Sequence, residues 1–179
     1  MRPVAPFVLL AALFTLASSA AAQTGEALIR KVGTPAPVPN PSFVAPKDLD
    51  YKVAWDVTAA PAKPDEVTPG IGRPASFLML AEANGVDRAH VHLAIIVFGG
   101  ATSAVLTNEA YKAANGVDNP NIPLLQAMTD AGVQVIVCGQ ALAGRKVPRE
   151  QVLPFVKVAT SATFARATLH ALGYATFAP

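Results

Sequence analysis

The sequence predicts an α/β fold in which a mainly parallel sheet of about five strands lies between helices. Segments with strand and helix character alternate along the chain and are joined by short connections. Two strand segments, residues 92–98 and 133–137, are unbroken apolar runs, as expected for strands covered on both faces of a parallel sheet. Glycine and proline punctuate the segments, and no internal repeat is visible.

The first half of the domain begins with a strand over residues 51–58, where bulky apolar and polar side chains alternate. A loop rich in proline and glycine covers residues 61–72, and the apolar spacing of residues 74–84 predicts a helix that ends at Gly85. The strand over residues 92–98 follows, and it is expected to be central in the sheet.

The second half continues the alternation. Helices are predicted over residues 102–114 and 124–131, with a turn and helix start at 119–123 between them, before the strand over 133–137 that ends at Cys138 and Gly139. A short helix opened by proline covers 148–153, a short strand covers 156–158, a helix capped by Ser161 runs to Leu172, and a last strand covers 174–177. This order argues for a parallel sheet with helices on both faces.

The chain is predicted to start with a signal peptide over residues 1–22. Arg2 precedes an apolar run that ends in small residues, and three alanines at 20–22 supply a cleavage site before Gln23. Residues 23–50 carry five prolines at 35, 37, 39, 41 and 46 and are expected to form an extended arm, either a spacer or a segment that wraps a neighbouring subunit. Residues 51–179 form one domain, located in the periplasm.

The composition excludes two classes of partner. Hydrophobic residues make up 52% of the chain and charged residues 15%, but no second apolar run is long enough to span a membrane after signal cleavage. The net charge of +2 is spread thinly, so a nucleic acid is not an expected partner. Cys138 has no second cysteine in the chain, so it is buried and inert, paired with another chain, or reactive.

Two glycine-containing turns are the candidate site, because ligands of parallel sheets gather at the carboxyl ends of strands. These turns are residues 98–102, with Gly99 and Gly100, and residues 138–142, with Cys138, Gly139 and Gln140. A thiol there can have a lowered pKa, and Arg145 and Lys146 lie one or two turns later as positive partners.

In that site Cys138 would be a nucleophile, Gly139 would allow close approach to its sulfur, and Gln140 would orient a sulfur-bound group. The alternative is that Cys138 is a small buried hydrophobic residue after a buried strand.

Other chemistries find little support in the sequence. His90 and His92 have a spacing that suits a metal, but a third ligand is not evident and His170 lies on a distant helix, so structural histidines and no metal are expected. No hydrolase elbow or phosphate loop is present, and Gly70-Ile71-Gly72 is a weak nucleotide signal because it does not follow a strand directly. We expect no cofactor.

Several short motifs together resemble the DsrE/DsrF-like family. They are Asn119-Pro120-Asn121, Leu124-Leu125, Ala131-Gly132-Val133, Val137-Cys138-Gly139-Gln140, Val156-Lys157-Val158-Ala159 with Ser161-Ala162, and Gly173-Tyr174-Ala175. The likeness covers the chain from about Tyr51 onward and is strongest from Asn119. The cysteine-glycine-glutamine motif is similar to that of an exported branch of the family.

The resemblance implies a three-layer α/β/α domain that assembles as a homo-oligomer, a trimer or hexamer, and adds Asn121 to the ligand-binding residues. It also implies that Cys138 carries sulfur as a persulfide between a donor and an acceptor protein. Many relatives have a histidine where this chain has Phe98, so that basic partner of the thiol is missing.

Three hypotheses about function follow from these observations. The leading one is a periplasmic sulfur-handling or thiol-binding protein that uses Cys138. The second is a non-catalytic oligomeric binding or scaffold module with a buried structural cysteine. The third is a redox sensor that dimerises through Cys138.

Overall fold

A computed structural model describes residues 24–178, and its centre is a five-stranded parallel sheet. The strands are β1 (Tyr51–Val57), β2 (Val91–Val97), β3 (Gln134–Cys138), β4 (Lys157–Ala159) and β5 (Ala175–Phe177), in the spatial order β4-β3-β2-β1-β5. All four strand pairs are parallel. The predicted α/β class with a parallel sheet is confirmed.

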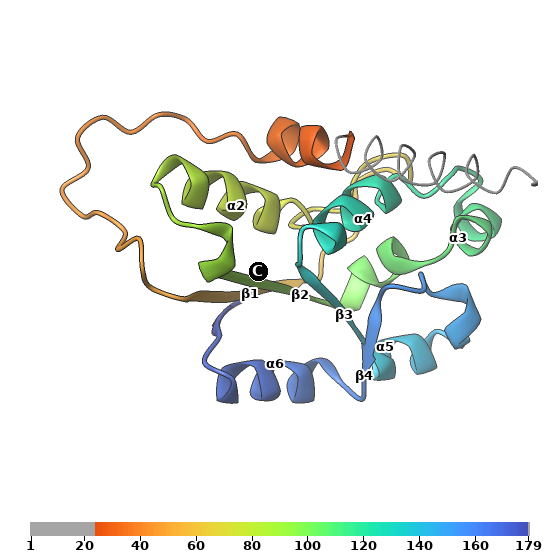
Figure 1. The fold of residues 1–179 in the computed structure, drawn as a ribbon. Coiled ribbons are helices and arrows are strands. Elements are labelled where there is room, and N and C mark those ends of the chain that lie inside the picture. The colour runs from red at the N-terminus through yellow and green to blue at the C-terminus, as the bar shows by residue number, and fades with distance from the viewer. Residues whose placement is uncertain (1–23, 179) are drawn as a thin grey trace, which may run out of the picture.

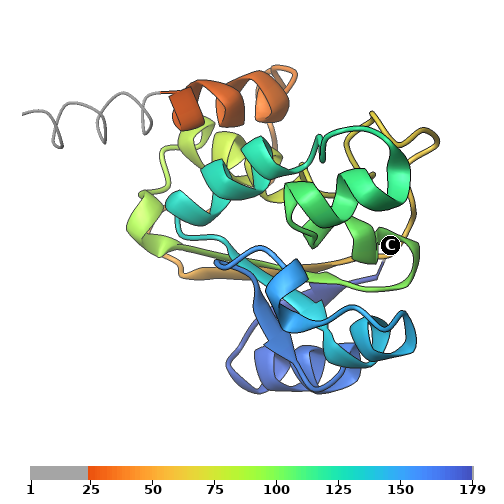
Figure 2. The ribbon, with the colours of Figure 1, turned by 90° about the vertical axis from the view of Figure 1, so that its right-hand side faces the viewer.

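Helices cover both faces of the sheet, which gives three layers (Figures 1 and 2). They are α2 (Arg73–Ala83), α3 (Asn108–Asn115), α4 (Ile122–Asp130), α5 (Gly139–Gly144) and α6 (Ala162–Ala171), with 3₁₀ helices η1 (Arg88–His90), η2 (Gly99–Val105) and η3 (Arg149–Gln151). The first three α-helices lie on one face, together with a helix over residues 24–33, while α6 lies on the other face with α5 beside it. Because the connection from β4 to β5 runs back across the sheet, a right-handed crossover places α6 opposite α2 and α4.

Strand β2 shows why the apolar runs occupy the centre of the sheet. Its side chains alternate between the two core clusters: Leu93 and Ile95 pack with α2 and α4, whereas Ala94 and Ile96 pack with α6. Each of these four side chains is at most 2% exposed. A strand with water on one face would need polar residues at every second position, so an unbroken run requires two covered faces.

The predicted helix over residues 102–114 is divided in the structure. Residues 99–105 form η2, and α3 starts at Asn108. Between them, Leu106 forms an isolated antiparallel bridge with Val152, and the Thr107 amide donates to the Gln151 carbonyl at 2.8 Å. The Thr107 hydroxyl then accepts from the Ala110 amide and caps α3. A backbone partner distant in sequence therefore interrupts the helix.

The expectation of an extended arm over residues 23–50 is wrong for its first part. Residues 24–33 form a helix whose Ile29 is 1% exposed and belongs to the main core. A Cβ at Gly33 would lie 2.3 Å from the Ala75 carbonyl oxygen, so this glycine lets the helix pack directly on the backbone of α2. The helix was not predicted because the segment is short and the prolines that follow it indicated an extended chain.

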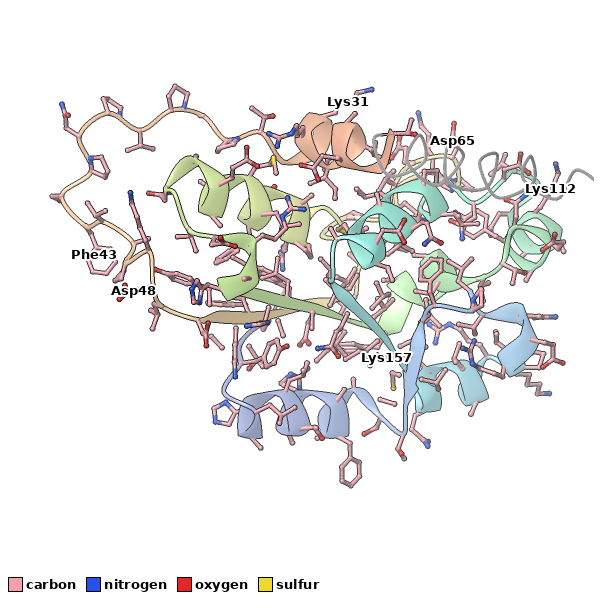
Figure 3. The ribbon with its side chains drawn as sticks, in the orientation of Figure 1. Lys31, Phe43, Asp48, Asp65, Lys112 and Lys157 are labelled. Atoms are coloured by element: carbon pink, nitrogen blue, oxygen red, sulfur yellow. The ribbon has the colours of Figure 1, made fainter. Side chains whose placement is uncertain are left out.

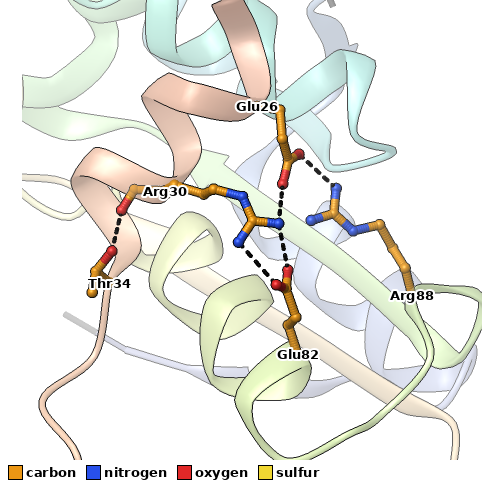
Figure 4. A network of polar contacts seen from close by, with 5 residues as sticks. All are labelled: Glu26, Arg30, Thr34, Glu82 and Arg88. Atoms are coloured by element: carbon orange, nitrogen blue, oxygen red, sulfur yellow. Dashed lines mark hydrogen bonds and ion pairs between the residues drawn. The ribbon is translucent and has the colours of Figure 1, made fainter. Parts of the chain in front are cut away.

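A network of charged side chains also attaches this helix to the domain (Figure 4). The Arg30 guanidinium donates to both carboxylate oxygens of Glu82 on α2, at 2.8 and 3.0 Å. Glu26 contacts Arg30 at 3.1 Å and Arg88 of η1 at 3.3 Å. These pairs are half-exposed, so they orient the helix more than they stabilise it.

Residues 34–50 contain neither helix nor strand, as expected for the proline-rich stretch. Figure 3 shows Phe43 and Asp48 on this stretch, and Phe43 is 91% exposed. The stretch is held at its end by Tyr51, whose hydroxyl donates to the Pro46 carbonyl at 2.8 Å. The choice between a spacer and a segment that wraps a neighbour stays a prediction.

The predicted signal peptide over residues 1–22 lies outside the described residues. Within residues 24–178, no helix has the length and apolar character that crossing a membrane requires.

Candidate functional site

Cys138 is the last residue of β3 and lies beside Phe98, the residue that follows β2. Val97 pairs with Val137 in the parallel register, so the next residues of both strands are neighbours. On the other side, Cys138 pairs with Ala159 of β4. The carboxyl ends of three strands therefore surround the thiol, as the order of elements predicted.

The Cys138 side chain faces the α6 layer. It is 7% exposed and belongs to the smaller core cluster with Ala162, Ala165 and Leu169 of α6. The thiol is free. Cys138 is thus largely buried, and only a small part of the residue is exposed to solvent.

Gly139 begins α5, a helix that the sequence did not reveal. A Cβ at Gly139 would lie 2.6 Å from the Ala159 carbonyl oxygen and 3.3 Å from that of Thr160. This glycine therefore lets the end of β4 approach the Cys138 turn. The expected close approach of another group to the sulfur stays a prediction. Gln140, the next residue, is exposed.

The two predicted turns are brought together, and Arg145 joins them. Its guanidinium donates to the Gly99 carbonyl at 2.7 Å and to the Ala141 carbonyl at 3.2 Å. The Thr102 hydroxyl donates to the same Gly99 oxygen at 2.8 Å. The Arg145 cation is thus used on backbone carbonyls, and it positions the turn after β2 against α5 instead of forming an ion pair with the thiol.

Steric constraints explain why glycine occupies positions 99 and 100. Gly99 has a φ of +58°, and a Cβ at Gly100 would lie 2.8 Å from the Ala60 amide nitrogen. The turn after β2 therefore packs against the loop after β1, where a larger residue would separate them.

Asn121 has a structural position. It is fully buried at the start of α4, its side-chain oxygen accepts from the Thr68 amide at 2.7 Å, and its amide group donates to Asn119 at 2.9 Å. Asn119 in turn donates to the carbonyls of Ala104 and Leu106. Asn121 therefore ties three loops together, and its side chain is not displayed to a ligand at the Cys138 turn.

Asp56 and Arg166 were missed by the sequence reasoning. Asp56 is 5% exposed on β1, and the Arg166 guanidinium of α6 donates to its carboxylate at 2.5 Å. The same guanidinium lies 5.9 Å from the centre of the Phe98 ring. A cation therefore lies over the ring beside Cys138, in the layer that covers the thiol. The signal that could have revealed the pair is a carboxylate within an otherwise buried strand.

The histidines lie away from this edge of the sheet, at the amino ends of the strands. His90 Nδ1 lies 2.7 Å from Asp50, and His92 Nε2 lies 4.0 Å from the same carboxylate. The hydrogen bond with Asp50 raises the pKa of His90, and it lowers the pKa of Asp50. Among residues 24–178, no group of three ligating side chains has a geometry that suits a metal.

A family model agrees with the motif resemblance. The model of the DsrE/DsrF-like family matches residues 68–178, from the loop before α2 to the end of β5. Among solved structures, the protein of unknown function MTH1491 from Methanobacterium thermoautotrophicum is similar over 73% of this chain and 100% of that chain, with 14% sequence identity and a TM-score of 0.47. A comparison with curated proteins gives no match.

Proposed function

The chain belongs to the DsrE/DsrF-like family, and from this premise we propose that it handles sulfur by holding sulfane sulfur on Cys138 as a persulfide. Family membership suggests a role of the sulfur-relay type. The observation that carries the proposal is the free cysteine at the carboxyl end of the buried strand β3, inside the matched region. A thiol in this position meets the loops and turns where parallel sheets bind their ligands.

The proposed step needs no outside oxidant. The Cys138 thiolate attacks the terminal sulfane sulfur of a polysulfide or persulfide donor, a new S–S bond forms, and the S–S bond of the donor breaks. The rest of the donor leaves as a shorter polysulfide, or as a thiolate when the donor is a persulfide, and takes up a proton, while Cys138 keeps one extra sulfur atom. Attack by an acceptor thiolate on that sulfur reverses the exchange and restores the cysteine.

The surroundings of Cys138 support a small donor. With 7% of the residue exposed, the sulfur is accessible to a linear polysulfide more readily than to the active-site loop of a folded donor. We propose that an acceptor protein contacts the exposed residues Gln140 and Arg145 at the same edge. The Arg166 guanidinium lies over the ring of Phe98, the neighbour of Cys138, and pairs with Asp56.

Mass spectrometry of the intact protein tests the proposal. After incubation with polysulfide under native conditions, the wild type should gain the mass of one sulfur atom, and a thiol reductant should remove it. The Cys138→Ser variant should gain nothing. An unmodified wild type, or an equal gain in Cys138→Ser, would contradict the proposal.

The burial of Cys138 favours one alternative, a non-catalytic binding or scaffold module with a structural cysteine. In that case the native thiol resists alkylation, and reaction requires unfolding. The alkylation rate is measured in native buffer and in denaturant as a function of pH. A native rate within about tenfold of the unfolded rate refutes the alternative, because a structural thiol is shielded.

We also propose that the protein assembles as a homo-oligomer in the periplasm. The predicted signal peptide supports export. Apolar side chains of β4 and α6 flank a groove of about 470 Å³, and Val158, Phe164 and Leu172 are 43%, 67% and 58% exposed. Light scattering should give the mass of a trimer or hexamer, and Phe164→Ser should shift the protein to smaller species.

Cell fractionation, with and without residues 1–22, tests export.

A further inference from the structure

A second cavity lies on the α2 face of the sheet, the face opposite to the Cys138 side chain. Its volume is about 560 Å³, and its lining includes Trp55 of β1, Gly70 and Gly72 of the following loop, and Arg73, Ser76 and Phe77 of α2. Cavities of this size are typical of sites for small molecules. The cavity lies toward the β5 edge of the sheet, because β1, which carries Trp55, is the strand next to the edge strand β5.

The cavity has an aromatic wall. The Trp55 ring meets the Phe77 ring edge-on, with centroids 5.9 Å apart and planes at 60°. On its other side, Trp55 stacks with Phe177 of β5 at 6.5 Å and 25°. These contacts hold the indole in a fixed orientation, while Trp55 and Phe77 are both only partly buried. A fixed and accessible aromatic pair is a surface on which a planar ring can stack.

Arg73 supplies a positive charge without a counterion. Its side chain is partly buried in the cavity lining, and within residues 24–178 it makes no ion pair or hydrogen bond. The other arginines of this part of the chain all have polar partners: Arg30, Arg88, Arg145, Arg149 and Arg166. A partly desolvated guanidinium favours an anionic partner, and its planar fork fits a carboxylate.

We propose that this cavity binds a small planar aromatic carboxylate, with its ring on Trp55 and Phe77 and its carboxylate on Arg73. The Ser76 hydroxyl, which lies 3.4 Å from the Gly72 carbonyl in a long hydrogen bond, is a second donor for the carboxylate. Arg73 is the single charged residue of the lining, so the site fits one negative charge better than the several charges of a polyphosphate.

The protein carries its own reporter, because Trp55 is the single tryptophan of the chain. Three probes of similar size separate the ring contact from the carboxylate contact. Benzoate has both an aromatic ring and a negative charge, benzamide has the aromatic ring without the charge, and cyclohexanecarboxylate has the charge without an aromatic ring. Benzoate should give a saturable change in Trp55 fluorescence and a matching calorimetric signal. The other two probes should bind roughly tenfold more weakly or worse, because each loses one contact.

Substitutions assign the contacts. Arg73→Gln should weaken benzoate binding by roughly tenfold or more, and Arg73→Lys should fall between it and the wild type. The matched control is Arg88→Gln, which removes an exposed arginine that pairs with Glu26 elsewhere and should bind like the wild type. Circular dichroism shows whether each variant is folded. The comparison of the three probes on the wild type tests the site even if a variant does not fold.

Several results would overturn the site. The first is the absence of a saturable signal with benzoate at up to roughly 10 mM, a concentration that fills even a site with millimolar affinity. The second is equal binding of the three probes, and the third is undiminished binding of benzoate to folded Arg73→Gln. The Cys138→Ser variant should bind benzoate normally. The site therefore stands or fails independently of the sulfur chemistry.

Discussion

Replacing Arg166 by methionine tests whether its pair with Asp56 fastens α6 to the sheet over Cys138. The substitution keeps an unbranched apolar side chain but leaves the Asp56 carboxylate, which is 5% exposed, without its charged partner. Removing one partner of a fully buried pair costs about 3–5 kcal/mol. The Arg166 side chain is 38% exposed, so water replaces part of the interaction, and we expect a loss of about 2 kcal/mol in the free energy of unfolding.

Urea denaturation followed by circular dichroism measures this loss, and a matched arginine provides the control. Arg30 pairs with Glu82 at a similar distance, but their side chains are 51% and 50% exposed. Arg30→Met should therefore cost no more than about 0.5 kcal/mol. The contrast isolates burial, since both substitutions remove the same group.

A double-mutant cycle completes the test. Asp56→Asn removes the carboxylate charge with little change of shape, so in the Arg166→Met background it should recover stability. The coupling energy between the two positions should be at least about 1 kcal/mol. If Arg166→Met is no more destabilising than Arg30→Met, or if the coupling is close to zero, the pair does not fasten α6.

Three further predictions concern other parts of the molecule. Gly139→Ala should destabilise the protein by about 1–3 kcal/mol because its Cβ meets the β4 carbonyl oxygen at 2.6 Å, whereas Gly144→Ala, with open space around it, should be nearly neutral in the same denaturation assay. Asn121→Ala should cost about 1–3 kcal/mol in that assay, since it leaves a buried loop amide without an acceptor, and a neutral result would show that the loops do not depend on it. The Asp50 carboxylate raises the pKa of His90, so the pair stabilises the fold while His90 is protonated and loses its effect as the pH rises through that raised pKa. It also fades as the pH falls through the lowered pKa of Asp50, and in an NMR titration Asp50→Asn should return the pKa of His90 toward 6.5.

Local patterns predicted most of the elements because each is encoded in neighbouring residues. The apolar runs that became β2 and β3 could be covered only in the middle of a sheet, and Ser161 caps α6 through the Phe164 amide as expected. The patterns failed where a distant partner decided the outcome. The bridge of Leu106 with Val152 divided a predicted helix, and packing on α2 made residues 24–33 helical.

For the candidate site, the residue pattern was enough to predict that Cys138 ends a buried strand, that a second glycine turn shares its edge of the sheet, and that the motifs are those of the DsrE/DsrF-like family. The groups around the thiol became known from the fold, because they come from separate elements. Arg145 is used on backbone carbonyls, while Arg166 reaches the Phe98 ring from α6, more than a hundred positions after Asp56. Side chains from separate elements come into contact only when the strand order and the placement of the helices bring them together. The spacing of these residues along the sequence therefore does not predict the contact.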